Sequence, residues 1–228
     1  LLKKEVYHLF LIGDLNPVEI PQAKESEFEY TLGVYVDKNA AIKENITSLK
    51  NEIISKLDIG FDTVFDWLSF FPLVARLKYL SLELSEDEIN QKIGKLENKI
   101  NNVFQEFIEH DFQSLFTLSG KDQPATVTRI LDYISGTEHE KKALIVIDGL
   151  NIWQWNAVKQ AIELEKSEDQ VSLAWIPTIT AWSRQAIFKG GNPDLSEDYS
   201  KEEKDFKKYW TRKGLQNYQV GFYRLNTI

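Results

Sequence analysis

The sequence predicts an α/β protein in which a mostly helical region precedes a domain built on parallel strands. The main observation is the run KKALIVIDGL, residues 141–150, which is continuously apolar and ends in Asp148 and Gly149, as a central strand of a parallel sheet does. Strand-like and helical segments then alternate to the end of the chain, which is typical of an α/β layer structure. We expect the N-terminal region to span residues 1–123 and the α/β domain to span residues 124–228.

The N-terminal region is predicted to begin with two β-like stretches, residues 6–12 and 28–36, separated by the proline- and glycine-containing segment GDLNPVEIPQ. Residues 61–84 are rich in aromatic side chains and predict a buried helix that is interrupted at Pro72. Between these segments, apolar residues recur at helical spacing and predict a helix with one apolar stripe. The stripe consists of Ile42, Ile46, Leu49, Ile53 and Leu57.

A long helix is predicted for residues 85–116, with Ser85 and Glu88 in the pattern of a capping box at its start. Its apolar residues are spaced by alternating steps of three and four, and they form a heptad-like seam: Ile89, Ile93, Leu96, Ile100, Val103 and Phe107. Such a seam packs either on a neighbouring helix of the same chain or on a partner chain. Because the seam is short, packing within the chain is favoured.

The expected α/β domain has seven elements after residue 124. In chain order they are a helix over 127–136, a strand over 141–148, a helix over 151–166, a strand over 171–177, a helix over 179–190, a basic helix over 200–214 and a strand over 218–225. Gly190 and Gly191 mark the end of the third helix.

Composition narrows the function classes. Of 228 residues, 43% are hydrophobic and 27% are charged, as in an ordinary soluble globular protein. The formal net charge of −8 argues against a surface that mainly coats nucleic acid, although it allows a phosphate substrate held by local charges. Cysteine is absent, which excludes a thiolate metal site. The sequence has no export signal and no run of apolar residues long enough to cross a bilayer, so we expect a cytoplasmic protein without a membrane partner.

Polar residues that can carry chemistry follow the two predicted strands of the domain. Asp148 ends the first strand, and the second runs into Pro177, Thr178 and Thr180. Ligands gather at the carboxyl ends of parallel strands, and a hydroxyl at a helix N-terminus lies in positive potential that favours an anion such as phosphate. Arg184, one turn further along that helix, is placed to contact phosphate oxygens. The alternative is that the threonine only caps the helix and that the aspartate only forms a turn.

The stretches ALIVIDGL and IPTITAWSRQAIFKG resemble the PglZ domain, a branch of the alkaline-phosphatase superfamily. The resemblance covers residues 124–228, and its most specific positions are Pro177, Thr178, Thr180, Arg184, Ala186, Phe188 and Gly190. It implies a partial alkaline-phosphatase-like parallel sheet with flanking helices. It also implies a divalent metal, usually zinc, bound by Asp148 and Thr180. Thr180 would be the nucleophile and Thr178 the fallback. Arg184, one turn further along the helix, keeps the role its spacing gives it and would bind the phosphate group of the substrate.

The resemblance further implies an activity and a setting. The activity is hydrolysis of a phosphate monoester or diester, including nucleotide and nucleic-acid phosphodiesters, through a phosphothreonine. The setting is a bacterial anti-phage system of the BREX type, which also contains a DNA methyltransferase. The superfamily completes its metal site with downstream Asp and His residues, whereas His8, His110 and His139 all precede the second motif. We therefore expect the chain to be truncated within the PglZ domain and to be inactive alone.

Two other functions remain open at this point. A non-catalytic assembly module of a multiprotein defence complex would use the helix over 85–116 as its docking surface. A receiver-like regulatory domain is disfavoured, because the N-terminal stretches lack paired acidic residues after a first strand.

Four tryptophans lie near the expected site, and they could stack on a base of the substrate. Packing in the core is favoured, because large aromatic side chains are mostly buried. The four tryptophans are Trp153, Trp155, Trp175 and Trp182.

Overall fold

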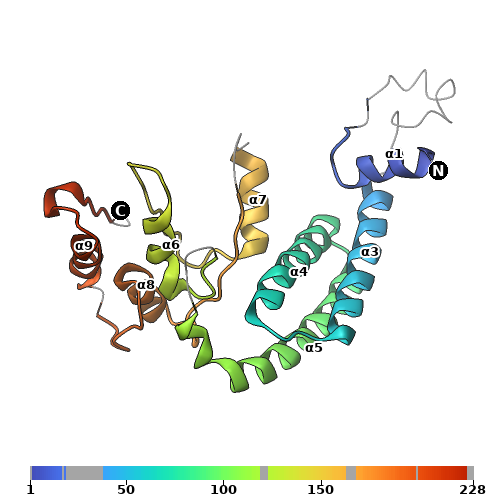
Figure 1. The fold of residues 1–228 in the computed structure, drawn as a ribbon. Coiled ribbons are helices and arrows are strands. Elements are labelled where there is room, and N and C mark those ends of the chain that lie inside the picture. The colour runs from blue at the N-terminus through green and yellow to red at the C-terminus, as the bar shows by residue number, and fades with distance from the viewer. Residues whose placement is uncertain are drawn as a thin grey trace. The chain divides into compact units, whose positions relative to one another are not determined.

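The computed structural model describes residues 2–16, 18, 38–118, 123–162, 168–198 and 200–224, and its regular elements in these ranges are helices (Figure 1). No strand or sheet is present in this described part of the chain. The paired extended residues found there are Thr126 and Leu173, which form an isolated parallel bridge. The prediction of an α/β fold with a partial alkaline-phosphatase-like parallel sheet is therefore wrong, and the described part is all-helical.

The chain divides into two compact units. Unit 1 contains Leu1–Gly60 and Leu73–Lys99, and unit 2 contains Phe61–Pro72 and Ile100–Ile228. Two long helices contribute to both units, because the division falls after Pro72 in α4 and after Lys99 in α5. The predicted boundary between residues 123 and 124 stays a prediction.

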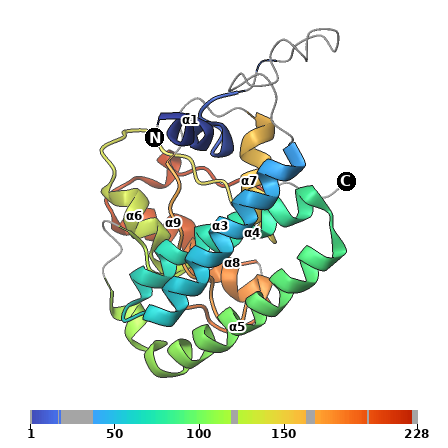
Figure 2. The same ribbon diagram turned by 90° about the vertical axis from the view of Figure 1, so that its right-hand side faces the viewer.

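Unit 1 contains α1 (Leu2–Leu11), α3 (Lys38–Ile59), the second part of α4 (Val64–Leu84) and the first part of α5 (Asp87–Asp111). Helix α1 contacts α3 (Figures 1 and 2). Residues 6–12 were predicted as a strand, but most of them belong to α1. A short apolar run does not distinguish a strand from a buried helix by its periodicity. The second predicted stretch, residues 28–36, lies outside the described residues.

The predicted helical stripes form the core of unit 1. On α3, Ile46, Leu49, Ile53 and Leu57 are all buried. On α5, Ile93 and Leu96 are buried too, and Ile100 is buried in unit 2. Packing of the seam within the chain is thus confirmed for these residues. The predicted capping box is wrong in its position, because Ser85 has φ 55° and its hydroxyl donates to the carbonyl of Leu82.

Unit 2 begins with an aromatic core around the first turns of α4. Thr63 and Asp66 form the start of this helix, because the Thr63 N–H donates to Asp66 Oδ2 at 2.8 Å and the Asp66 N–H donates to Thr63 Oγ1 at 3.3 Å. Trp67 is buried, and its ring centroid lies 4.9 Å from that of Phe104 in α5. Helix α4 continues through the exposed Pro72, so the predicted interruption is wrong.

The helices predicted for the rest of unit 2 are confirmed. They are η3 (Val127–Arg129) with α6 (Ile130–Gly136), α7 (Ile152–Ile162), α8 (Thr180–Lys189) and α9 (Glu202–Arg212), and two short 3₁₀ turns accompany them, η2 (Ser114–Thr117) and η4 (Asn217–Gln219). The cluster of α6, α8 and α9 positions the candidate site, and α8 lies beside α9 (Figure 1). The aromatic rings of Phe188, Phe206 and Phe222 fill the space between them, with centroids 5.2–6.0 Å apart.

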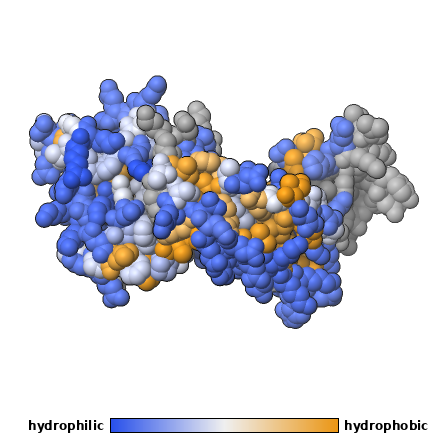
Figure 3. Space-filling view, turned by 60° about the horizontal axis from the view of Figure 1, so that its bottom comes forward, coloured by the Kyte–Doolittle hydropathy of each residue, from blue (hydrophilic) through white to orange (hydrophobic). Residues whose placement is uncertain are grey.

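The three strands predicted for this unit are wrong within the described residues. The segment 143–147, which was expected to be a buried central strand, is not buried: Ile145 is 82% exposed and Ile147 is 56% exposed, whereas Leu144 and Val146 are half-buried. Among the described residues, no strand pairs with the backbone of this segment. The face drawn in Figure 3 is largely hydrophilic, with apolar side chains gathered in smaller patches. None of the described helices combines the length and the apolar character that crossing a membrane requires.

Candidate functional site

Helix α8 presents a hydroxyl at its N-terminal end. Its N-cap is Ile179, which is extended with φ −79° and ψ 127° and provides no side-chain cap, so Thr180 is the first helical residue rather than the cap. The first hydrogen bond of the helix runs from the Ser183 N–H to the Ile179 carbonyl at 2.9 Å. The N–H groups of the three residues before Ser183 therefore point out of the helix end without intrahelical partners.

Thr178 and Thr180 are both exposed. No hydrogen bond joins the Thr180 hydroxyl to any other residue in the described ranges. The reading of Thr180 as an N-cap is thus wrong, and its hydroxyl is open to a ligand.

Arg184 lies one turn along α8 from Thr180 and is held by α9. Its Nε donates to Glu202 Oε1 and its Nη2 donates to Glu202 Oε2, both at 2.8 Å, in the two-pronged geometry of a strong arginine–carboxylate pair. The Glu202 side chain is 0% exposed, whereas that of Arg184 is 24% exposed. Arg224 also donates to Glu202 Oε2, at 3.0 Å. One buried carboxylate therefore holds two guanidinium groups.

Asp148 approaches the same helix from a distant part of the chain. Its Oδ2 lies 3.9 Å from Nη1 of Arg184, a distance that allows electrostatic attraction but is too long for a hydrogen bond. Asp148 and Gly149 form a turn in which Gly149 has φ 74°. The structure thus brings Asp148 to Arg184, on the helix that Thr180 opens, by a turn and an ion pair rather than by the ends of parallel strands, and it shows no contact between Asp148 and Thr180 among the described residues.

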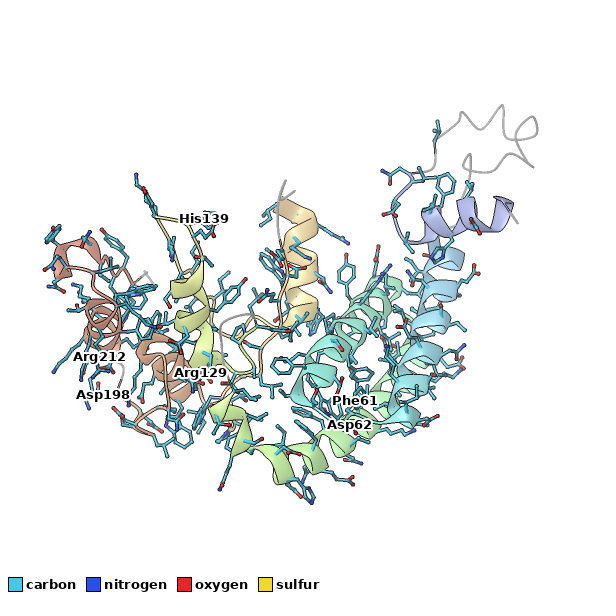
Figure 4. The ribbon with its side chains drawn as sticks, in the orientation of Figure 1. Phe61, Asp62, Arg129, His139, Asp198 and Arg212 are labelled. Carbon is cyan, nitrogen blue, oxygen red and sulfur yellow. The ribbon has the colours of Figure 1, made fainter. Side chains whose placement is uncertain are left out.

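The described residues do not by themselves fit a zinc centre. Zinc sites use three or four protein ligands, whereas the described ranges contain no group of three or more histidine, aspartate or glutamate side chains that could hold a metal. The nearest charged neighbour of Asp148 in this site is a guanidinium, which competes with a cation. His139 lies in the exposed segment after α6 (Figure 4), and His110 is exposed on α5. Binding of metal by Asp148 and Thr180 stays a prediction.

Sequence reasoning missed Glu202 and Arg224. Glu202 is next to Glu203, which is exposed and pairs with Lys207 at 2.6 Å, so composition alone does not separate the two glutamates. A signal was present in the spacing: Glu202 lies four residues before Phe206, on the face of α9 that packs inward. An apolar stripe that extends to a glutamate predicts that this carboxylate is buried.

Gln185 is a further missed residue, and it fixes the loop that leads to α9. It is 6% exposed, its Nε2 donates to the Ser196 carbonyl at 2.6 Å, and its Oε1 accepts from the Asp194 N–H at 3.0 Å.

Of the predicted tryptophans, Trp175 is buried and its ring centroid lies 6.2 Å from that of Phe112, which favours the packing role.

A second charged cluster joins α6 to α9. Asp132 Oδ1 accepts from the Tyr209 hydroxyl at 2.6 Å and from Lys213 Nζ at 3.3 Å, and its Oδ2 accepts from Arg129 Nη1 at 3.2 Å (Arg129 is marked in Figure 4). Burial alone would raise the pKa of Asp132, but these donors outweigh burial and lower it. Burial and the bond to Asp132 raise the pKa of Tyr209. The cluster fastens α9 to α6 and contains none of the predicted site residues.

Searches against family models, curated proteins and solved structures found no match for the chain.

Proposed function

We propose that the chain carries the nucleophile and a phosphate-binding arginine of a phosphate-ester hydrolase of the PglZ type. The observation that carries the proposal is the approach of Asp148 to Arg184, on the helix that Thr180 opens. The proposal takes its reaction from the residue pattern of the motif, since the parallel sheet that the resemblance implied is absent from the described residues. Its substrates are phosphate monoesters or diesters, including those of nucleotides and nucleic acids.

Each residue has a role that follows from its position. The Thr180 hydroxyl is exposed and is not used as a cap, so its Oγ1 is free to form a bond to phosphorus as the bond from phosphorus to the ester oxygen breaks. The hydroxyl proton passes to solvent water, and the leaving oxygen takes up a proton from solvent and departs as the alcohol. The open N–H groups and the positive end of α8 stabilise the charge that develops on the phosphoryl oxygens. Arg184 neutralises part of that charge. Water then hydrolyses the phosphothreonine.

Metal dependence remains part of the proposal as an expectation, with zinc as the expected ion and Asp148 and Thr180 as two of its ligands. The wider setting, an anti-phage system that includes a DNA methyltransferase, is likewise proposed from the resemblance. Measuring the zinc content of the purified protein tests the first expectation directly.

The proposal is tested by hydrolysis of bis-p-nitrophenyl phosphate, with and without added zinc, by the protein at its natural full length. We expect Thr180→Ala to lower turnover by about 10³-fold or more, because removal of a nucleophile has effects of this size or larger. The matched control is Thr178→Ala, which is exposed two positions earlier and should retain most of the turnover. Unchanged turnover in Thr180→Ala removes the nucleophile assignment, and loss only in Thr178→Ala transfers it to Thr178.

A second candidate, a non-catalytic assembly module, is favoured by a different observation. Within the apolar segment 143–147, Ile145 and Ile147 are exposed, and exposed apolar side chains that lie together mark interaction surfaces. The heptad-like seam is not available for this role at Ile93, Leu96 and Ile100, which are buried in the chain. A cell that carries Thr180→Ala and keeps the full biological effect of the protein would support the assembly module over the hydrolase.

A further inference from the structure

Glu202 has an unusual position for a carboxylate. It is the first residue of α9, its side chain is 0% exposed, and it accepts hydrogen bonds from Arg184 and Arg224. A buried carboxylate is costly unless it is paired and hydrogen-bonded, so these three side chains form one fixed unit. The unit contains two positive charges and one negative charge.

The hydrogen bonds determine how Arg184 is oriented. Glu202 contacts the edge of the guanidinium that consists of Nε and Nη2. Because a guanidinium is planar and rigid, fixing one edge also fixes the direction of the remaining nitrogen. That nitrogen, Nη1, is directed toward Asp148, with 3.9 Å between Nη1 and Oδ2.

Exposure shows which part of this unit is accessible. The Glu202 side chain has no exposed surface, whereas 24% of the Arg184 side chain and 44% of the Asp148 side chain are exposed. A ligand in solvent can therefore reach the side chains of Arg184 and Asp148, and it cannot reach the carboxylate of Glu202. A phosphate group that took the place of Asp148 at Nη1 would leave the hydrogen bonds from Nε and Nη2 to Glu202 unbroken.

We infer that Glu202 is a positioning residue that, with Arg224, holds Arg184 oriented toward a phosphate group near the N-terminal end of α8. The inference rests on the proposed function for the class of ligand, and it adds a residue that the sequence motif does not contain. Glu202 acts through Arg184 and does not touch the ligand. Partners that orient a binding group typically contribute about 10- to 100-fold in affinity or activity, as measured at metal sites.

The test measures binding of inorganic phosphate by calorimetry, so that it needs no turnover. We expect Glu202→Gln to weaken phosphate binding about 10-fold or more. The matched control, Glu203→Gln, changes the adjacent exposed glutamate and should leave binding within about twofold of wild type. In an Arg184→Lys background, Glu202→Gln should cause no further loss, because the interaction it supports is already absent. Wild-type affinity in a folded Glu202→Gln variant, or a full additional loss in the Arg184→Lys background, would overturn the inference.

A second measurement decides the question if Glu202→Gln does not fold. The NMR signal of the Arg184 Nε–H group in the unmutated protein, identified by its absence in Arg184→Lys, reports on the bond to Glu202. We expect this signal to persist when phosphate is added, while the Nη signals shift. Loss of the Nε–H signal on phosphate binding, or no effect of phosphate on any Arg184 signal, would overturn the inference. The proposed function is refuted by a different result. If Thr180→Ala retains turnover while the phosphate-binding results are as expected, the hydrolase proposal is wrong and the role of Glu202 stands.

Discussion

Replacing Gly190 by alanine tests the packing that joins the end of α8 to α9. Gly190 follows α8 in the left-handed region, with φ 63° and ψ 44°, where a side chain costs about 1–2 kcal/mol. An added Cβ would lie 2.8 Å from Cδ2 and Cε2 of Tyr209 and 3.3 Å from Cδ1 of Leu131. Overpacking of this kind adds about 1–3 kcal/mol. We therefore expect Gly190→Ala to lower the free energy of unfolding by about 2–5 kcal/mol.

The Tyr209 ring has little freedom to move away from the added methyl group. Its hydroxyl donates to Asp132 at 2.6 Å, and its ring centroid lies 5.4 Å from that of Trp210. The matched control is Gly214→Ala, at the end of α9 in the same unit. Gly214 has φ 99°, but an added Cβ would meet nothing within 4 Å. This control should lose only the backbone strain, about 1–2 kcal/mol.

The assay is urea unfolding followed by tryptophan fluorescence, with circular dichroism as a second probe of the same transition. A third variant separates strain from steric overlap: in a Tyr209→Ala background, the cost of Gly190→Ala should fall toward that of Gly214→Ala, since only the 3.3 Å contact with Leu131 remains. Equal losses for Gly190→Ala and Gly214→Ala, or an undiminished loss in the Tyr209→Ala background, would refute the reasoning.

Two further predictions concern stability. Since the folded pKa of Asp132 is lowered, its stabilising contribution is complete above about pH 4 and is lost as the pH falls through the lower folded pKa. Tyr209→Phe, which removes one hydrogen-bond donor to Asp132, should lower the free energy of unfolding by about 1.5–3 kcal/mol at neutral pH. The variant should also lose less stability in acid than the wild type does. Identical acid slopes of unfolding free energy against pH for the two proteins would contradict the prediction. Gly94→Ala should stabilise unit 1 by about 0.5–1 kcal/mol, because Gly94 lies inside α5 and an added Cβ meets nothing within 4 Å. A urea midpoint below that of the wild type would contradict this prediction.

The helices could be predicted from the sequence because their signals are local. The stripe of α3 and the seam of α5 repeat at helical spacing, and Ile53 and Ile93 are buried as this spacing requires. Gly190 has the left-handed conformation that its position after α8 predicted. In each case the residues that carry the signal lie in the helix that they predict or directly next to its end.

The strands could not be predicted in this way, because a strand requires a partner that its own residues do not specify. The run that ends at Asp148 has the composition of a buried strand, yet Ile145 is 82% exposed. Apolar character indicates that a segment gains by burial, but it does not indicate what covers the segment. The same limit applied to the second predicted strand, in which Leu173 forms a single bridge with Thr126.

The candidate site combines both kinds of information. The motif residues Thr180 and Arg184 lie on one side of α8 because four residues span about one helical turn, which spacing alone predicts. The charged partners of Arg184 come from elsewhere: Asp148 lies in a turn, and Glu202 is the first residue of the next helix. Of the two described carboxylates placed against Arg184, Asp148 is partly exposed and Glu202 is buried, so a ligand from solvent can take the place of Asp148 but not that of Glu202. A phosphate group that takes the place of Asp148 would thus find the arginine already oriented, and the entropic cost of orienting a long side chain would have been met during folding.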